Sequence, residues 1–402
     1  MRLALAISSL FPSGGLQRDC VNIARLLKEA GSDVVIVTAD HRERMNSYGV
    51  PIEVWSSSAL TNPGRDLQLG NKLAAASGTR FDRIVGFNKM PGLDVYYCGD
   101  PPYSNLNRSA LKRFFPKFRA QQMLERCCFG PQTNTALLVL QRSQQTAYRE
   151  IWKTLPDRFR ILSPTLDPAR RRPELRTTTG QPALRNKLDV SVNDWLWLSI
   201  ASAPAVKGVD RTIRAMSVFT DAFLSIAGVS AGSRNGRWIM RLARSWGVAD
   251  RIQLLGHRED ISEVMAAADL FVHPARLDTT GTVILEAVVN GLPVIASAVC
   301  GYAEHVTAAD AGLVVLDPWN QSAFEAALWT ARDRARCGAW SANGASYGRV
   351  ARLDTGLAEA AKLMVGPLWG RTPNDGNDLR SNDVPAGCAQ DTNLCTGRQA
   401  II

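Results

Sequence analysis

Short apolar runs alternate with amphipathic stretches along the first part of the chain. Apolar runs at residues 3–8, 32–38 and 83–87 predict buried strands. Between them, apolar positions at helical spacing predict helices over residues 16–30 and 67–76. The order strand, helix, strand is typical of a parallel sheet whose strands are connected by crossover helices.

The same alternation begins again in the second part of the chain. Further strands are expected at residues 195–201, 222–227, 251–255, 270–273 and 293–297. Helices are expected between them at residues 209–219, 236–246, 261–268 and 283–290. The pattern therefore predicts an α/β protein of two Rossmann-like domains whose sheets face one cleft.

Changes in composition place the expected domain boundaries. Residues 163–173 are rich in proline and charge, which is typical of a linker. We therefore expect an N-terminal domain at residues 1–165 and a C-terminal domain at residues 166–369 that ends in a helix. Residues 370–402 are rich in Asn, Asp, Gly, Thr and Ser and lack periodicity, so we expect a disordered tail.

Length and composition are sufficient for two buried hydrophobic cores. The chain has 402 residues, more than a single core usually holds, and 46% of them are hydrophobic. No apolar run reaches the roughly 18 residues that span a bilayer. Eight cysteines form no CxxC pair and only four histidines occur, so we expect reduced thiols in the cytoplasm and no metal site.

The net charge of +10 indicates a polyanionic neighbour, which could be nucleic acid, an anionic membrane or a phosphorylated substrate. Much of the charge lies in residues 105–126, where apolar and aromatic side chains are interleaved with basic ones. The basic residues of this segment are Arg108, Lys112, Arg113, Lys117, Arg119 and Arg126. Pro116 divides the segment into two short helical pieces. An anionic membrane surface, nucleic acid or a basic solvent-exposed helix face would each explain this composition.

Three features carry candidate chemistry, and the first is Gly14-Gly15 between a predicted strand and a predicted helix. Glycine lets the backbone approach an oxyanion closely, and a helix N-terminus favours negative charge, so a phosphate could bind there. A tight turn between strand and helix is the alternative.

The second feature is Lys207, which follows a predicted strand and precedes a helix. A lysine at this end of a parallel strand can neutralise a diphosphate, although a solvated lysine at a helix start is commoner. The third is the segment 273–287, in which Asp278 precedes a Thr-Thr-Gly turn and Glu286 lies in an apolar helix. A carboxylate at Glu286 is costly without a partner, which ribose hydroxyls could supply. Otherwise Asp278 caps the helix and Glu286 forms a structural ion pair.

The sequence of these segments resembles retaining glycosyltransferases of family 4, which have the GT-B fold. The Asp278–Glu286 spacing, the Lys-Gly at Lys207 and the Gly-Leu-Pro-Val after Asn290 carry this resemblance. More narrowly, the chain resembles the lipopolysaccharide core glucosyltransferase I family (WaaG) over roughly residues 1–365. The matching stretches are residues 11–19, 85–96, 207–211, 265–270 and 298–303. General family 4 enzymes do not share the string at 85–96.

The resemblance implies a substrate pair and a location. The donor would be a UDP-hexose such as UDP-glucose, and the acceptor a heptose of the lipopolysaccharide inner core. Transfer would retain the anomeric configuration without a metal or other cofactor. The protein would be cytoplasmic and peripheral on the inner face of the bacterial cytoplasmic membrane, held there by residues 105–126, and would not bind nucleic acid.

The resemblance also implies roles for individual residues. On the donor side, Gly14 and Gly15 would lie against the diphosphate, and Lys207 would stabilise its departing charge. Asp278 would contact the hexose hydroxyls, and Glu286 would hold the ribose. The backbone of three consecutive residues would contact sugar and phosphate, namely Gly281, Thr282 and Val283.

On the acceptor side, Asp100 and Asp19 match acidic positions that could orient or deprotonate the acceptor hydroxyl, with Asp100 favoured because it follows a predicted strand. Either could instead be structural, with Asp19 only helping the helix N-terminus.

Three positions depart from the family pattern. Asp278 stands where the family usually has Glu, Val206 where many relatives have Arg, and Ala201 where they have Gly. These changes would fit a different donor, such as a UDP-N-acetylhexosamine, or a slow enzyme. They also leave two rivals open, a family 4 enzyme with another lipid or polysaccharide acceptor and a non-catalytic homologue that binds membrane.

Overall fold

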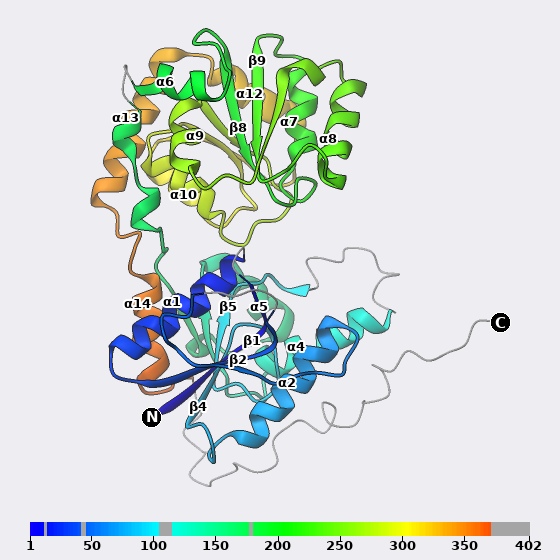
Figure 1. Cartoon of the computed structure of the whole chain (residues 1–402), viewed down its shortest axis with the longest axis vertical. Helices are drawn as coiled ribbons and strands as arrows, with labels where there is room; N and C mark the ends of the chain where they lie inside the picture. Colours follow the sequence, from blue (N-terminus) through cyan, green and yellow to red (C-terminus); the bar gives the residue numbers. More distant parts are fainter. Residues whose placement is uncertain (12–13, 42–45, 104–114, 177–179, 371–402) are drawn as a thin grey trace, which may run out of the picture. The chain divides into compact units, whose positions relative to one another are not determined.

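The computed structural model describes residues 1–11, 14–41, 46–103, 115–176 and 180–370. The chain forms two compact units, and Figure 1 shows both. Among the described residues, one unit comprises Met1–Ser163 and Thr355–Gly370, and the other comprises Pro164–Asp354. The first boundary therefore lies in the proline-rich stretch that was predicted to contain it. Residues 371–402, for which a disordered tail was expected, lie outside the described ranges.

Within the described residues, the N-terminal unit contains a seven-stranded sheet in the order β3-β2-β1-β4-β5-β6-β7. Every neighbouring pair is parallel. The strands are β1 (Arg2–Leu10), β2 (Asp33–His41), β3 (Ile52–Val54), β4 (Arg83–Gly86), β5 (Val95–Cys98), β6 (Ala136–Val139) and β7 (Phe159–Ile161). Such a sheet is buried on both faces, which explains why its strands are almost continuously apolar.

Helices cover both faces of this sheet. They are α1 (Gly15–Glu29), α2 (Asn62–Ala76), α4 (Pro116–Phe129), α5 (Arg142–Trp152) and α14 (Gly356–Val365). Leu3, Leu5 and Ile7 of β1 pack with α1 and α14. Ala4 and Ala6, which alternate with them, pack with α2, α4 and α5. The alternation of strand side chains thus fixes which helices lie on which face.

The last helix belongs to the N-terminal unit, which corrects its predicted place in the C-terminal domain. Its buried residues Leu357, Ala360, Ala361 and Met364 follow helical spacing and form one stripe. That stripe joins the core cluster of α1 and β1. Arg83 at the start of β4 also donates hydrogen bonds to the carbonyls of Met364, at 2.6 Å, and Gly366, at 2.7 Å. An apolar stripe shows that a helix packs, but its partner is set by the tertiary fold.

In the part that the structure describes, the C-terminal unit has a six-stranded sheet in the order β10-β9-β8-β11-β12-β13. All its pairs are parallel. The strands are β8 (Trp195–Ile200), β9 (Ala222–Ala227), β10 (Ile252–Gly256), β11 (Leu270–His273), β12 (Val294–Ser297) and β13 (Gly312–Val315). The prediction of two Rossmann-like α/β domains is confirmed.

The helices of the C-terminal unit also form two layers. They are α6 (Gly180–Lys187), α7 (Val209–Met216), α8 (Arg234–Ser245), α9 (Ile261–Ala267), α10 (Thr282–Val289), α11 (Ala303–Ala308), α12 (Gln321–Thr330) and α13 (Arg334–Val350). One core cluster joins α6, α9, α10 and α11 to one face of the sheet. The other joins α7, α8 and α12 to the opposite face.

Each sheet has a topological switch point, where the connections from two neighbouring strands lead toward opposite edges of the sheet. In the C-terminal unit it lies between β8 and β11, and in the N-terminal unit between β1 and β4. Ligands of open α/β sheets bind at the carboxyl ends of the strands near such points. Across the described residues, no helix combines the length and apolarity needed to cross a bilayer.

Candidate functional site

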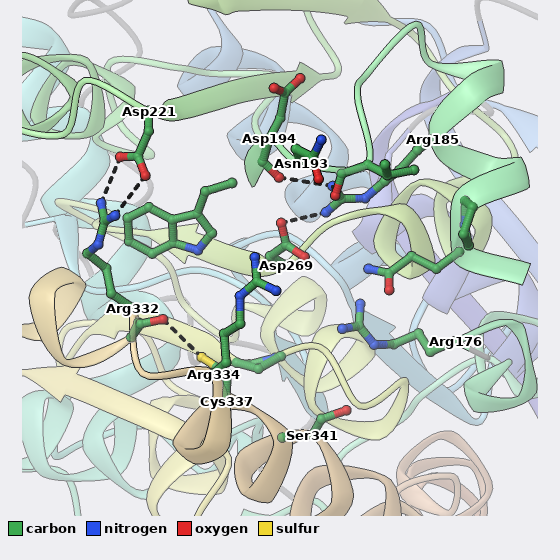
Figure 2. Close-up of a pocket in the computed structure, with 17 residues that line it drawn as sticks. Arg176, Arg185, Asn193, Asp194, Asp221, Asp269, Arg332, Arg334, Cys337 and Ser341 are labelled. Atoms are coloured by element: carbon green, nitrogen blue, oxygen red, sulfur yellow. Dashed lines mark hydrogen bonds and ion pairs between the residues drawn. The ribbon is translucent and has the colours of Figure 1, made fainter. Parts of the chain in front are cut away.

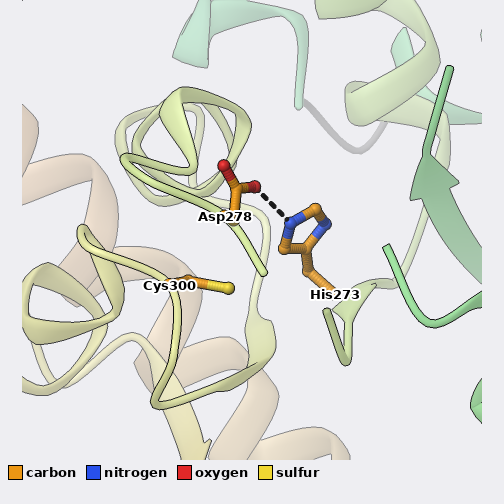
Figure 3. A group of neighbouring side chains, drawn as sticks. All are labelled: His273, Asp278 and Cys300. Carbon is orange, nitrogen blue, oxygen red and sulfur yellow. Dashed lines mark hydrogen bonds and ion pairs between the residues drawn. The ribbon is translucent and has the colours of Figure 1, made fainter. Parts of the chain in front are cut away.

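The switch point of the C-terminal unit brings Lys207 and Asp278 together. Lys207 lies in the turn after β8, and Asp278 lies in the loop between β11 and α10. The Lys207 Nζ atom is 2.7 Å from Asp278 Oδ2. His273 at the end of β11 places its Nε2 2.8 Å from the same oxygen, as Figure 3 shows. The His273 side chain is 1% exposed and that of Asp278 is 11% exposed, so this contact is largely shielded from water.

Asp278 is held in its charged form. Burial alone would raise the pKa of this carboxyl, but the hydrogen bond and charge of His273 and the Lys207 ammonium outweigh burial. The pKa of Asp278 therefore lies below its ordinary value. Asp278 also stabilises the turn before α10, because its Oδ1 accepts a hydrogen bond from the Gly281 amide at 3.0 Å. The N-cap of α10 is Gly281, so Asp278 does not cap the helix itself, and its second oxygen contacts Lys207 and His273.

Cys300 completes a group of possible metal ligands with His273 and Asp278. One ligand atom from each lies within 4.8 Å of the others. However, burial, with the nearby charge of Asp278, raises the pKa of the Cys300 thiol to about 12. The Asp278 oxygen nearest to His273 already contacts both His273 Nε2 and the Lys207 ammonium. These donors fit a metal ion poorly, because a cation already occupies the place beside the carboxylate.

Several contacts fasten the Lys207 turn to the Asp278 loop. The Arg276 guanidinium makes two hydrogen bonds to Asp210, at 2.7 and 2.6 Å. The Arg276 amide donates to the Val206 carbonyl at 2.8 Å. Gly208 has a φ of 72°, and a Cβ there would lie 1.9 Å from the Pro274 carbonyl oxygen. Lys207 is thus held at a fixed place relative to the Asp278 loop.

Sequence reasoning missed the parts that Arg276, Asp210 and His273 play here. Arg276 and His273 lie inside the singled-out segment, and Asp210 lies in the Lys-Gly-Val-Asp-Arg string. Their proximity to the two candidate residues was a signal. Their pairing across the two loops could not be read from the chain, because it depends on β8 and β11 being neighbours.

The start of α10 presents the remaining donor-side candidates. Gly281 is the N-cap with a φ of 75°, and no side chain caps the first turn. The first-turn amides of Thr282 and Val283 are of the kind that a helix leaves without an internal partner. Glu286 lies one turn later, at the spacing that puts it on the same helix face as Thr282 and Val283. Its neighbours Leu285 and Ala287 are buried, whereas Glu286 is half-buried.

In the N-terminal unit, Gly14 is the N-cap of α1 and Gly15 its first residue. Gly14 has a φ of −91°, and Gly15 is not among the residues with positive φ, so the turn itself does not require glycine. A Cβ on Gly15 would meet no atom within 4 Å in the described structure. On Gly14 it would meet only movable side chains, those of Gln17 and Phe11. The tight-turn explanation therefore loses support, and an open helix N-terminus remains.

The two acidic candidates of this unit have different surroundings. Asp19 accepts a hydrogen bond from the Tyr97 hydroxyl at 2.9 Å. Burial raises the pKa of Asp19, and the bond from Tyr97 and the charge of Arg18 only partly oppose it. Asp100 follows β5 and is half-buried. No hydrogen bond to the Asp100 carboxylate is made from the described residues, so this carboxylate is better placed than that of Asp19 to meet a substrate.

The basic segment is described only in part, because residues 104–114 lie outside the described ranges. Pro116 is the first residue of α4. The other predicted helical piece, before Pro116, lies mostly outside the described ranges. Lys117, Arg119 and Arg126 are exposed on α4. Phe118 is only 3% exposed, so it packs in the core and is not available as a membrane anchor. This corrects the grouping of Phe118 with the interfacial side chains.

A separate pocket of about 510 Å³ lies at the opposite edge of the C-terminal sheet, and Figure 2 shows its lining. Its lining residues Asp194, Asp221 and Asp269 directly precede β8, β9 and β11. Arginine side chains contact these residues, as in the pairs Arg332–Asp221 and Arg185–Asp269. The pocket is therefore at the amino ends of the strands, away from Lys207 and Asp278.

Two parallel α/β units, one with a lysine and carboxylates at its switch point and the other with a helix N-terminus at its own, have the architecture of a nucleotide-sugar-dependent glycosyltransferase of the GT-B fold. Residues 180–345 match the family model of the group 1 glycosyl transferases. The lipopolysaccharide glucosyltransferase WaaG of Escherichia coli K12 is 32% identical over 92% of this chain and 100% of its own length. The chain belongs to the WaaG family of glycosyltransferases.

Solved structures agree with this assignment. A crystal structure of WaaG superposes with a TM-score of 0.81 at 30% identity, covering 91% of this chain and all of that chain. HepE of Anabaena, solved with UDP and glucose, has a TM-score of 0.68 at 18% identity and covers 90% of this chain and 98% of its own. The second match shows the shared fold.

Proposed function

We propose that this enzyme transfers a hexose from a UDP-hexose, with UDP-glucose the first candidate, to a heptose of the lipopolysaccharide inner core, with retention of anomeric configuration. Full-length similarity to WaaG, a lipopolysaccharide glucosyltransferase, supports this choice of substrates. The observation that carries the proposal is the contact of Lys207 with Asp278 beside the start of α10. It brings a cation, a charged carboxylate and helix amides to one place.

On the donor side, each group has a chemical task. As the bond between hexose and diphosphate breaks, negative charge develops on the departing UDP. The Lys207 ammonium and the first-turn amides at Thr282 and Val283 would stabilise that charge. The ionised Asp278 would accept hydrogen bonds from hexose hydroxyls, and Glu286 would accept them from the ribose. Gly14 and Gly15 would admit the diphosphate to the start of α1.

Two departures from the family pattern bear on which donor the enzyme uses. Asp278 has a shorter side chain than the usual Glu, and Val206 stands where many relatives have Arg. Val206 is 41% exposed, and its carbonyl accepts the Arg276 amide. Arg276, two residues before Asp278, is paired with Asp210, and Lys207 is paired with Asp278. The enzyme would hold the diphosphate with the Lys207 ammonium, which Asp278 shares, and with helix amides. This favours including UDP-N-acetylhexosamines among the donors tested.

On the acceptor side, Asp100 would accept the proton of the attacking heptose hydroxyl, since its carboxylate is free of hydrogen bonds from the described residues. Asp19 would keep a supporting part through Tyr97 of β5. The transfer would need no metal if the Lys207 ammonium and the first-turn amides of α10 neutralise the departing diphosphate.

A peripheral position on the inner face of the cytoplasmic membrane fits a lipid-linked acceptor. The surface that would mediate it is the segment 105–126, whose described part exposes Lys117, Arg119 and Arg126 on α4. Phe115 before α4 is 62% exposed and could enter the headgroup region.

A donor screen tests the proposal. The purified protein is mixed with heptosylated core acceptor and, in turn, with UDP-glucose, UDP-galactose and the UDP-N-acetylhexosamines, and the release of UDP is measured. We expect one donor to give acceptor-dependent UDP release, and UDP itself to raise the melting temperature. If no donor releases UDP and no nucleotide stabilises the fold, the enzyme assignment fails.

A further inference from the structure

A buried ion pair in the N-terminal unit has no part in the donor chemistry. Lys89 follows β4, and its Nζ lies 3.0 Å from Oε1 of Glu125 on α4. Their side chains are 0% and 1% exposed. Lys89 also lies in the string 85–96, which distinguishes WaaG-like sequences from other family 4 enzymes. A buried pair of this kind is seldom more stabilising than well-packed apolar residues, so stability alone does not explain it.

Lys89 and Glu125 both form hydrogen bonds with the backbone of the loop that follows Asp100. The Lys89 ammonium donates to the Pro101 carbonyl at 3.1 Å and lies 3.8 Å from the centre of the Tyr103 ring. Glu125 Oε1 accepts a hydrogen bond from the Tyr103 amide at 3.0 Å. The second carboxylate oxygen, Oε2, accepts the indole N–H of Trp152 at 3.1 Å, which fixes the orientation of Glu125. The pair therefore holds residues 101–103 at both ends.

Two side chains of α5 hold the same loop from its beginning. The Asp100 carbonyl accepts hydrogen bonds from Gln144 Nε2 at 3.2 Å and from the Tyr148 hydroxyl at 3.1 Å. Both side chains are buried, at 3% and 0% exposure. The backbone from Asp100 to Tyr103 is thus fixed by buried groups of α4, of α5 and of the loop after β4. The Asp100 carboxylate, in contrast, receives no hydrogen bond from any described residue.

We infer that the Lys89–Glu125 pair is a positioning device, which sets the Asp100 backbone so that the Asp100 carboxylate meets the acceptor hydroxyl. The inference rests on the proposed function, because it needs Asp100 on the acceptor side. Both residues act through Asp100 and touch no substrate. A base must lie within hydrogen-bond reach of the proton it takes, and a shift of about 1 Å costs on the order of 10²-fold in rate.

The test removes both charges together, so that neither is left alone in the core. In the variant Lys89→Met/Glu125→Gln, we expect kcat/KM for the core acceptor to fall by roughly 10- to 100-fold. The stabilisation by UDP should stay at the wild-type value, since the donor site lies in other residues. In an Asp100→Asn background the same double substitution should change the rate by less than about threefold, because residues that act through one group are not additive.

Arg158→Lys is the matched control for simple destabilisation. Arg158 is a buried cation of the same unit, 1% exposed. It donates to the carbonyls of Gly130 at 2.9 Å and Thr135 at 3.1 Å, which precede β6 at the amino edge of the sheet. We expect this variant to melt at a lower temperature and to keep its kcat/KM within about twofold while folded.

Amide hydrogen exchange gives a reading that does not depend on activity. The Tyr103 amide should be protected in the wild type and exchange at least tenfold faster in the double variant. Unchanged exchange, undiminished transfer, or additive losses with Asp100→Asn would each overturn the inference. A wild type that transfers no sugar would instead refute the proposed function, while the exchange result would still decide whether the pair fixes the loop.

Discussion

At the residue scale, the proposed donor side depends on one carboxylate, Asp278, whose neighbours lower its pKa although burial opposes them. Lys207, Asp278 and His273 meet at one carboxylate oxygen. The sequence indicated the first two as candidates, since each follows a predicted strand. It could not show their contact or the part of His273, which depends on two strands from distant parts of the chain lying side by side.

Replacing Lys207 by Ala should lower kcat/KM by about 10²- to 10³-fold, because a preorganised group that stabilises the departing charge is lost. The steady-state release of UDP from the preferred donor measures this. Lys187→Ala is the matched control, since Lys187 is an exposed lysine of the same unit, paired with Glu263 at 2.9 Å. Wild-type turnover in Lys207→Ala would refute the role of this residue.

Asp66 on α2 makes stability depend on pH. Burial raises its pKa to about 7, with the charge of Asp100 adding to the rise, while Ser8 and Arg65 oppose it. The folded protein therefore holds a proton that the unfolded chain loses near pH 4. Stability should fall as pH rises from about 4 to 7, and then level off.

Asp66→Asn should remove this loss. We expect the variant to equal the wild type near pH 4 and to exceed it by about 2–4 kcal/mol above pH 7. Thermal unfolding of both proteins between pH 4 and 8.5 checks this, with exposed Glu29→Gln as a control. A difference that does not change with pH would contradict the pKa of Asp66.

At the scale of elements, longer strands and helices were predicted well from apolar spacing. β1, β2, β8 and β9 fall where the apolar runs placed them. The short strands β6 and β13 were not predicted, because a run of four apolar residues does not by itself distinguish a strand from a buried helix turn. The place of α14 was predicted wrongly, since its partner α1 lies at the other end of the chain.

Gly208→Ala tests how tightly the β8–α7 turn and the β11–α10 loop are joined. The added Cβ would meet the Pro274 carbonyl, and the positive φ disfavours any L side chain. Gly247→Ala is the control, because Gly247 has a φ of 66° but no atom within 4 Å of the added Cβ. Differential scanning calorimetry should show Gly208→Ala losing at least about 1 kcal/mol more than Gly247→Ala. Equal losses would mean that the loops do not meet as described.

At the scale of the whole molecule, the fold class and family could be predicted because the α/β alternation occurs twice and the motifs lie in order. The net charge of +10 could only indicate a polyanion. Which polyanion it is depends on the surface that displays the charge, and burial of Phe118 shows that composition alone overstates the apolar part of that surface.

Sedimentation with liposomes tests the proposed membrane surface. We expect the protein to pellet with vesicles that contain anionic lipid, and less so as salt is raised, because the Debye length shortens to about 3 Å at 1 M. Replacing Lys117, Arg119 and Arg126 together by Gln should weaken pelleting, whereas replacing the exposed Arg237, Arg241 and Arg244 of α8 should not. Equal pelleting with neutral vesicles would contradict an electrostatic contact.

The central claim is the transfer of one hexose to a core heptose. The most direct measurement is the structure of the product made from the donor that the screen selects and purified heptosylated core, by mass spectrometry and NMR of the new anomeric proton. We predict the mass of one added hexosyl residue, linked to a heptose in the same anomeric configuration as in the donor. An inverted linkage, or an acceptor recovered unmodified with every UDP-sugar, would contradict it.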